Sequence, residues 1–181
     1  MISFIDLQSQ FKRIQPELEE RVLGVLRSGQ YILGPEVTSF EHKLAEFVGA
    51  KHAITCSSGT DALMIALMAK GIGPGDAVFT TPFTYFSTAE AIALLGATPI
   101  FVDIEISTFN MSPTALYAAI IALKECDPKN NALPKWPVEK LRGLTPKGVI
   151  TVDLFGLPAD HERINATAEE HGLFVLEDAA Q

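Results

Sequence analysis

Cysteine, long apolar runs and positive charge are all scarce in this sequence. The two cysteines, Cys56 and Cys126, are too few for a disulfide framework or a zinc site. Glycine, proline or charged residues interrupt every apolar run well before the roughly 18 residues that suggest a membrane-spanning helix. Only 14 Lys and Arg stand against 22 Asp and Glu, which gives a formal net charge of −8. Phosphate contacts need clustered basic residues, so this balance argues against a nucleic-acid-binding protein.

Two further signals are missing. Residues 1–6 contain no basic segment followed by an apolar stretch, so we expect no secretory signal peptide. The histidines have neither the spacing of metal ligands nor a paired Cys or Glu, so we expect no metal site; they are His42, His52, His161 and His171. We therefore interpret the sequence as a soluble, cytoplasmic protein without a membrane or nucleic-acid partner.

The composition is that of a globular domain. Of the 181 residues, 48% are hydrophobic and 20% are charged, which excludes a disordered or low-complexity chain. In the later part of the chain, short runs rich in Val, Ile, Leu and Phe recur, as in strands that are buried on both faces of a parallel sheet. The expected strands are His52–Cys56, Ala77–Thr81, Thr98–Ile104, Gly148–Leu154 and Leu173–Glu177.

Helical segments separate these runs. The expected helices are Asp61–Lys70, Ser87–Leu95, Ser112–Leu123 and Asp160–His171. This alternation predicts an α/β fold with a doubly wound, mainly parallel sheet. Two more helices are expected to start near Pro16 and Pro35. We therefore expect a helical segment over residues 1–50 that packs on a main α/β domain over residues 51–181.

One segment breaks this rhythm. Lys124–Lys147 holds six of the 14 basic residues and four of the 11 prolines. It is interpreted as a solvated surface loop between a helix and a strand. Long loops are sometimes functional, so contact with a substrate or a partner remains an alternative.

Cys56–Leu63 lies where an expected strand turns into an expected helix. A helix N-terminus offers unpaired N–H groups and a partial positive charge, which suit a phosphate group. Gly59 would allow close approach, and the hydroxyl of Thr60 could donate a hydrogen bond. The alternative is an ordinary helix cap. The glycines of a dinucleotide-binding fingerprint and the Gly-Lys pair of a Walker loop are absent.

Two other turns could carry chemistry. Asp178 closes a strong strand, and ligands of open α/β sheets bind at the carboxyl ends of the strands. Asp103 and Asp153 also end or follow strands, so position alone does not select Asp178. In the turn Thr81–Thr88, an aromatic residue such as Tyr85 could cover a flat ligand or could belong to the core.

Five segments in order resemble one family. They are Gly29–Val37, Ser58–Leu63, Pro82–Tyr85, Val102–Ile104 and Glu177–Gln181. Together they are similar to the DegT/DnrJ/EryC1/StrS aminotransferases, which are fold type I enzymes dependent on pyridoxal 5'-phosphate (PLP). The resemblance runs from about Phe4 to Gln181. It implies transfer of an amino group, with glutamate as the expected donor, to a keto nucleotide-sugar. The Gly29–Val37 run most resembles enzymes that act on a UDP-3-keto-hexuronate in surface-polysaccharide synthesis.

The resemblance also implies roles for particular residues. Gly59, Thr60 and Asp61 would hold the PLP phosphate, and Tyr85 would stack on the pyridine ring. Asp178 would face the ring nitrogen, and Gln181 would hydrogen-bond the ring hydroxyl. Residues 51–181 would then be the first part of the PLP-binding domain.

No lysine follows Asp178 in this sequence. The resemblance therefore implies that the Schiff-base lysine lies beyond Gln181, that no catalytic residue is in the given chain, and that the chain is an N-terminal portion whose α/β fold is incomplete at the C-terminus. Some members carry histidine in place of that lysine, so a sugar 3-dehydratase of the same fold is an alternative. A non-catalytic α/β regulator is another. The family also implies a homodimer with shared active sites.

Overall fold

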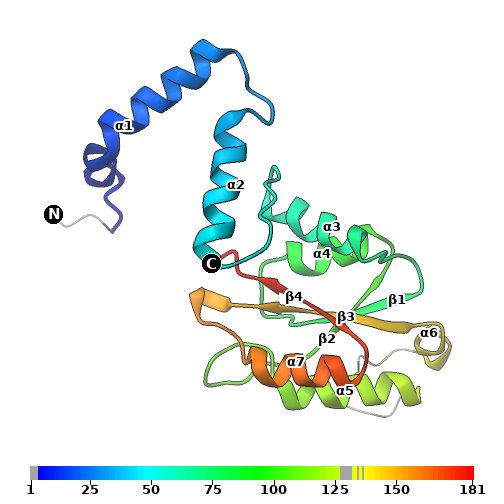
Figure 1. Ribbon diagram of the computed structural model, residues 1–181. Coiled ribbons are helices and arrows are strands. Elements are labelled where there is room, and N and C mark those ends of the chain that lie inside the picture. The colour runs from blue at the N-terminus through cyan, green and yellow to red at the C-terminus, as the bar shows by residue number, and fades with distance from the viewer. Residues whose placement is uncertain (1–3, 127–131, 134, 136) are drawn as a thin grey trace. The chain divides into compact units, whose positions relative to one another are not determined.

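The computed structural model describes residues 4–126, 132–133, 135 and 137–181 (Figure 1). The chain forms two compact units, Met1–Thr55 and Cys56–Gln181. The helices are α1 Leu7–Ser28, α2 Pro35–Val48, α3 Gly59–Ala69, α4 Ser87–Leu94, α5 Pro113–Glu125, α6 Val138–Arg142 and α7 His161–Glu170, with a 3-10 turn η1 Leu154–Gly156. The strands are β1 Asp76–Thr80, β2 Thr98–Phe101, β3 Thr145–Val152 and β4 Phe174–Asp178.

The second unit is built on a four-stranded sheet with the order β2-β1-β3-β4. All three pairings are parallel, with Phe79 opposite Ile100 on one side of β1 and opposite Val149 on the other. Nearly every residue of β1 is buried, as expected for a strand that is covered on both faces. The predicted α/β fold with a parallel sheet is confirmed.

Helices cover both faces of this sheet (Figure 1). On one face, Leu63 and Leu67 of α3 and Ile92 of α4 pack with Val78 and Ile150 of the sheet. The larger core lies on the other face, where α5 and α7 pack against the sheet; it includes Phe79, Ile100, Leu116, Ile120, Val149 and Ile164. The doubly wound arrangement is therefore also confirmed.

One predicted strand is wrong. Residues 52–56 form no strand in the described chain, and Ile54 is 83% exposed. A strand needs a neighbour to take its N–H and C=O groups. Here the N–H and the hydroxyl of Thr55 instead donate to the carboxylate of Glu41, each at 2.8 Å. The apolar run alone did not indicate that the side chain of Glu41 would accept the hydrogen bonds of Thr55.

The first unit consists of α1 and α2. The prediction that a helix starts near Pro16 is wrong, because α1 starts at Leu7 and contains Pro16 inside it. Asp6 caps the helix by accepting hydrogen bonds from the N–H of Ser9 at 3.0 Å and from its hydroxyl at 2.6 Å. The expected start of a helix at Pro35 is confirmed.

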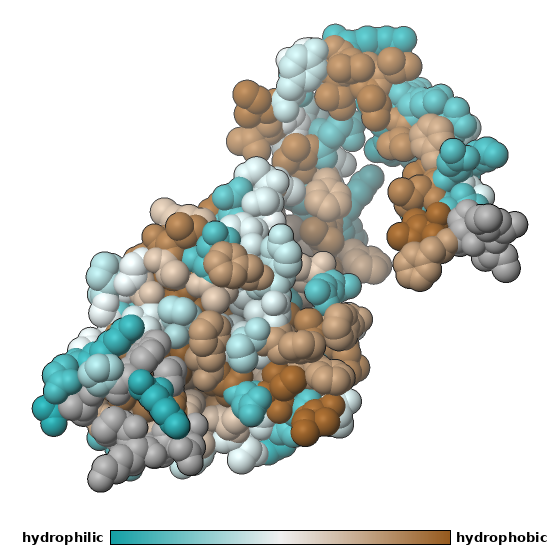
Figure 2. Space-filling view, turned by 180° about the vertical axis from the view of Figure 1, so that it is seen from behind, coloured by the Kyte–Doolittle hydropathy of each residue, from teal (hydrophilic) through white to brown (hydrophobic). Residues whose placement is uncertain are grey.

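Apolar side chains gather on the surface of the first unit (Figure 2). Those of α1 follow a spacing of three or four residues, so they form one stripe along the helix; its exposed members are Leu7, Phe11, Ile14, Leu18 and Val22. Among the described residues, no helix is both long and apolar enough to cross a membrane.

The interpretation of Lys124–Lys147 as a loop is partly wrong. Residues 127–131, 134 and 136 lie outside the described residues, but the segment also contains α6 and the start of β3. Leu133 and Leu141 are buried in the larger core. These two apolar side chains pack the segment against the sheet. The prolines and charged residues around them had instead indicated a loop.

Candidate functional site

A hollow of about 300 Å³ opens at the carboxyl ends of the strands. The chain leaves β1 toward β2 on one side and leaves β3 toward β4 on the other, so these adjacent strands form the switch point at which open α/β sheets bind ligands. The hollow is lined by Gly59, Thr60, Leu63, Thr84, Tyr85, Ser87, Val152, Asp178, Ala180 and Gln181.

The N-terminus of α3 forms one wall of the hollow. Ser58 caps the helix by accepting a hydrogen bond from the N–H of Asp61 at 3.1 Å. The N–H groups of Gly59 and Thr60 belong to the first turn, where no intrahelical partner exists. The Thr60 hydroxyl lies 2.8 Å from the hydroxyl of Ser87, which positions it. This wall therefore offers donors to an anion.

Asp61 was predicted to share the phosphate site, but it does not line the hollow. Its N–H is taken by Ser58, and its carboxylate accepts hydrogen bonds from the hydroxyls of Ser57 and Ser58. These bonds, that of Ser57 foremost, hold the pKa of Asp61 below its ordinary value. The carboxylate is thus used to brace the turn.

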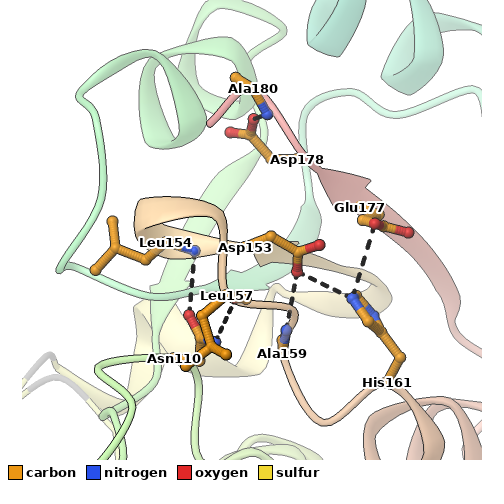
Figure 3. Close-up of polar contacts among 9 residues, drawn as sticks. All are labelled: Asn110, Asp153, Leu154, Leu157, Ala159, His161, Glu177, Asp178 and Ala180. Carbon is orange, nitrogen blue, oxygen red and sulfur yellow. Dashed lines mark hydrogen bonds and ion pairs between the residues drawn. The ribbon is translucent and has the colours of Figure 1, made fainter.

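Asp178, at the end of β4, forms the opposite wall of the hollow. Its Oδ2 accepts a hydrogen bond from the Thr88 hydroxyl at 2.9 Å. Its Oδ1 accepts one from the N–H of Ala180 at 3.4 Å (Figure 3). Asp103 and Asp153 do not line the hollow. Asp103 accepts from the adjacent N–H of Ile104. Of the three carboxylates, Asp178 is therefore the one that lines the hollow.

Gln181 lies beside Asp178 on the same wall. Its Oε1 accepts a hydrogen bond from the N–H of Phe155, which leaves its NH₂ group available as a donor. Phe155 has a φ of 57°, a left-handed conformation that is uncommon outside glycine and is often found at functional sites. Asn110 braces this turn by hydrogen bonds to the N–H of Leu154 and the carbonyl of Leu157 (Figure 3).

Tyr85 stands at the edge of the hollow and is 74% exposed, so it is not a core residue. A second hollow of about 290 Å³ shares Thr84, Tyr85 and Gln181 with the first. Phe83 and Phe155 also line it, and the ring of Phe83 lies 5.4 Å from that of Phe109. An aromatic surface therefore borders the candidate site.

Near the ends of β3 and β4, the fold gathers three titratable side chains. His161 Nε2 lies 3.0 Å from Asp153 Oδ1 and 3.9 Å from Glu177 Oε1 (Figure 3). Their possible metal-ligating atoms lie within 4.8 Å of one another, a grouping that the sequence did not indicate. Asp153 also accepts a hydrogen bond from the N–H of Ala159 at 2.9 Å, so these contacts join β3, β4 and α7.

Sequence reasoning missed the residues that support the site. Thr88 contacts Asp178, Ser87 contacts Thr60, and Phe155 contacts Gln181. Thr88 and Ser87 lie in the first turn of α4, directly after the aromatic residues of the turn Thr81–Thr88. This position could have indicated that they lie near the site. No local pattern connects Phe155 with Gln181, because only the pairing of β3 with β4 brings them together.

Comparison with known proteins places the chain among aminotransferases. The sequence model of the DegT/DnrJ/EryC1/StrS aminotransferase family matches residues 12–181. The chain is 49% identical to a UDP-2-acetamido-2-deoxy-3-oxo-D-glucuronate aminotransferase from Pseudomonas aeruginosa, over 100% of this chain and 44% of that protein. The chain thus spans less than half the length of this relative.

Solved structures show the same relationship. An aminotransferase of this family from Brucella abortus is 47% identical, with a TM-score of 0.86 over 100% of this chain and 44% of the other. NtdA from Bacillus subtilis, solved with bound cofactor PMP, is 29% identical, with a TM-score of 0.74 over 99% of this chain and 37% of the other. The switch-point hollow and these matches lead to one conclusion: the chain belongs to the DegT/DnrJ/EryC1/StrS aminotransferase family.

Proposed function

We propose that this chain is part of a PLP-dependent aminotransferase that moves an amino group, with glutamate as the donor, onto a keto nucleotide-sugar. The observation that carries the proposal is the hollow at the switch point, with the N-terminus of α3 on one side and Asp178 and Gln181 on the other. The identity of 49% to a UDP-3-oxo-glucuronate aminotransferase supports a UDP-3-keto-hexuronate as the substrate. The corresponding role is cytoplasmic synthesis of a surface polysaccharide such as O-antigen.

The residues of the hollow fit a phosphorylated pyridine. An added Cβ at Gly59 would meet no atom within 4 Å, so the space above the first turn of α3 is open to a phosphate group. Amides of this turn and the Thr60 hydroxyl would hold that phosphate. The carboxylate of Asp178 stands on the wall where a protonated ring nitrogen would lie, and the aromatic ring of Tyr85 is free to stack.

When bound, PLP supplies an electron sink for breaking a bond at the amino-bearing carbon. The chain's own residues prepare that chemistry. The negative charge of Asp178 would keep a proton on the ring nitrogen, and the NH₂ group of Gln181 would donate to the ring hydroxyl. The helix N-terminus would orient the phosphate. In the complete protein, the lysine that binds the cofactor is proposed to follow Gln181.

The complete protein is also proposed to be a homodimer with shared active sites. The turn between α1 and α2 exposes Tyr31, Ile32 and Leu33 by 65%, 89% and 76%. Three adjacent apolar side chains left open by their own unit are typical of a contact surface. A two-fold interface is the commonest arrangement of protein oligomers, and it would cover this turn.

The test uses the full-length protein. After addition of PLP, we expect an absorption band near the visible edge that changes when glutamate is added. A protein that remains colourless after incubation with PLP and removal of the unbound cofactor would refute the proposal.

The variant Asp178→Asn tests the role of the carboxylate directly. An amide has no negative charge to hold the ring proton, so we expect a folded protein whose turnover falls by roughly a hundredfold or more, as when one electrostatic group of an active site is removed. Asp103→Asn is the matched control, because Asp103 also follows a strand but does not line the hollow. Turnover near that of the wild type in Asp178→Asn would mean that another group serves the ring.

A further inference from the structure

Asp178 is held by a chain of hydroxyl groups that no sequence motif indicated. The Thr88 hydroxyl lies 2.9 Å from Asp178 Oδ2, and the Thr84 hydroxyl lies 3.0 Å from the Thr88 hydroxyl. Thr88 is 0% exposed, so water does not replace its contacts. Thr84 lines the hollow. The three side chains thus connect the wall of the site with the carboxylate.

The direction of these hydrogen bonds follows from the chemistry of the groups. An ionised carboxylate only accepts hydrogen bonds, so the single hydroxyl proton of Thr88 must point to Asp178. The oxygen of Thr88 can then only accept at its contact with Thr84, and Thr84 becomes the donor. Because the N–H of Ala180 donates to the second carboxylate oxygen, both oxygens of Asp178 are held.

We infer that Thr88 is a positioning residue for Asp178, and that the Thr84 and Thr88 hydroxyls form a directed relay that holds this carboxylate toward the ring nitrogen of the cofactor. The inference rests on the proposed function. The relay fixes the rotation of the carboxylate before a ligand arrives. A protonated ring nitrogen then meets an acceptor that is already oriented, which lowers the entropic cost of binding. Thr88 itself contacts Asp178 and Thr84, and it does not line the hollow.

A purely structural role for Thr88 is the competing explanation, and matched variants separate the two. Thr88→Val keeps the shape of the side chain and removes the hydroxyl, whereas Thr88→Ser keeps the hydroxyl. Thr80→Val is the control for the loss of a buried hydroxyl, because Thr80 is also 0% exposed and donates to the carbonyl of Ile150 at 3.2 Å. Thr80 does not line the hollow.

The experiment measures binding of PLP to the full-length protein by its absorption band, with thermal unfolding recorded in parallel. We expect Thr88→Val to bind PLP roughly tenfold or more weakly, as for loss of a hydrogen bond to a charged group, and to shift the band. Thr88→Ser should restore both within about twofold, a fraction of one hydrogen bond. Thr80→Val should lose thermal stability without changing either.

An analogue of PLP whose ring nitrogen is replaced by carbon isolates the relay. It cannot donate to Asp178, so Thr88→Val should bind this analogue as well as the wild type does. Thr84→Val, at the end of the relay that lines the hollow, provides a second variant if Thr88→Val does not fold. Removal of this neutral hydrogen bond should weaken PLP binding by about threefold and leave binding of the analogue unchanged.

Four results would overturn the inference. Unchanged PLP binding in Thr88→Val would do so, as would failure of Thr88→Ser to restore it. Equal losses for PLP and for the analogue would assign Thr88 to general packing of the hollow. If Thr88→Val does not fold, unchanged PLP binding in Thr84→Val would refute the relay. A wild-type protein that does not bind PLP would instead refute the proposed function, so the two failures are distinguishable.

Discussion

For a residue at the rim of the hollow, what the fold requires can differ from what a bound ligand would require. Gly59 is the clearest case, because the backbone conformation at this position does not require a glycine. It begins α3, and an added Cβ would meet no atom within 4 Å. An alanine there fits the folded chain, but its methyl group would project into the space where a phosphate would lie. The fold therefore does not require glycine at this position, and the proposed phosphate site would account for it.

We predict that Gly59→Ala folds normally and binds PLP about tenfold more weakly, because the methyl group would disturb at least one charge-assisted hydrogen bond to the phosphate. Its free energy of unfolding should be unchanged or higher by up to about 1 kcal/mol, since glycine disfavours helices. Titration with PLP and thermal unfolding would measure both. Gly24→Ala in α1 is the matched control, because an added Cβ at Gly24 also meets no atom within 4 Å. Equal affinity of Gly59→Ala and wild type for PLP would contradict the prediction.

At the scale of elements, the ends of β3 and β4 are joined by more than their ladder. Beyond the pairing of Val152 with Asp178, the N–H of Asp153 donates to the carbonyl of Asp178 at 3.1 Å. The carboxyl groups of Asp153 and Glu177 also share a hydrogen bond beside His161. Since Glu177 directly precedes Asp178, this cluster helps to hold the strand end that carries the candidate site.

The pKa values of the two carboxyl groups are shifted in opposite directions. The hydrogen bond with Asp153, followed by burial and the nearby negative charge, raises the pKa of Glu177 above its ordinary value. Burial acts to raise the pKa of Asp153 as well. However, hydrogen bonds from the N–H of Ala159, from Glu177 and from His161 outweigh burial, so the pKa of Asp153 lies below its ordinary value.

We predict that Glu177→Gln is more stable than the wild type at neutral pH. A raised pKa means that the stabilisation from the protonated group is complete below the unfolded pKa of about 4.3 and is lost as the pH rises through the folded pKa. Glutamine keeps a neutral side chain at every pH, so the difference should vanish in acid. Thermal unfolding between acidic and neutral pH would measure it.

Asp153→Asn should show the opposite sign. The depressed pKa of Asp153 contributes stability above the unfolded pKa of about 3.9, and this contribution is lost as the pH falls through the folded pKa. This variant should therefore be less stable than the wild type at neutral pH, by an amount that shrinks in acid. Differences that do not depend on pH in both variants would refute the coupling between the two groups.

At the scale of the whole molecule, the first unit presents apolar surface that its own helices do not bury. Neither α1 nor α2 contains a buried residue, although α1 carries an apolar stripe along its length (Figure 2). The turn between them adds Tyr31, Ile32 and Leu33. This surface is the physical reason for proposing a dimer, since an exposed apolar patch of this kind is otherwise an aggregation hazard.

We predict that the full-length protein has the mass of a dimer in light scattering at micromolar concentration, and that Leu33→Asp shifts it toward the monomer and lowers transamination. A charge in an apolar contact loses its hydration without gaining a partner. Tyr31→Ala should act in the same direction more weakly. A monomeric wild type that transaminates would refute the shared site, and variants that keep both dimer and activity would remove this turn from the interface.

The sequence by itself predicted the parallel α/β architecture of the second unit and most of the named residues that line the hollow: Gly59, Thr60, Tyr85, Asp178 and Gln181. Continuous apolar runs at Ala77–Thr81 and Gly148–Leu154 predicted buried parallel strands, because only a sheet covered on both faces needs them. Thr60 and Asp178 were candidates because each lies at the end of such a local element, although position alone did not separate Asp178 from Asp103 and Asp153. These features depend on neighbouring residues in the chain, and such patterns are readable without a structure.

Only the tertiary structure decided which groups meet. It excluded the strand at residues 52–56, because pairing requires a partner and Thr55 bonds to Glu41 instead. It distinguished Asp178 from Asp153, since only Asp178 lines the hollow, whereas the Asp153 carboxylate contacts Ala159 and His161. It also brought Thr88 to Asp178 across 90 positions of sequence. Hydrogen bonds act over about 3 Å, so a one-dimensional pattern does not specify them until the sheet aligns the elements that carry them.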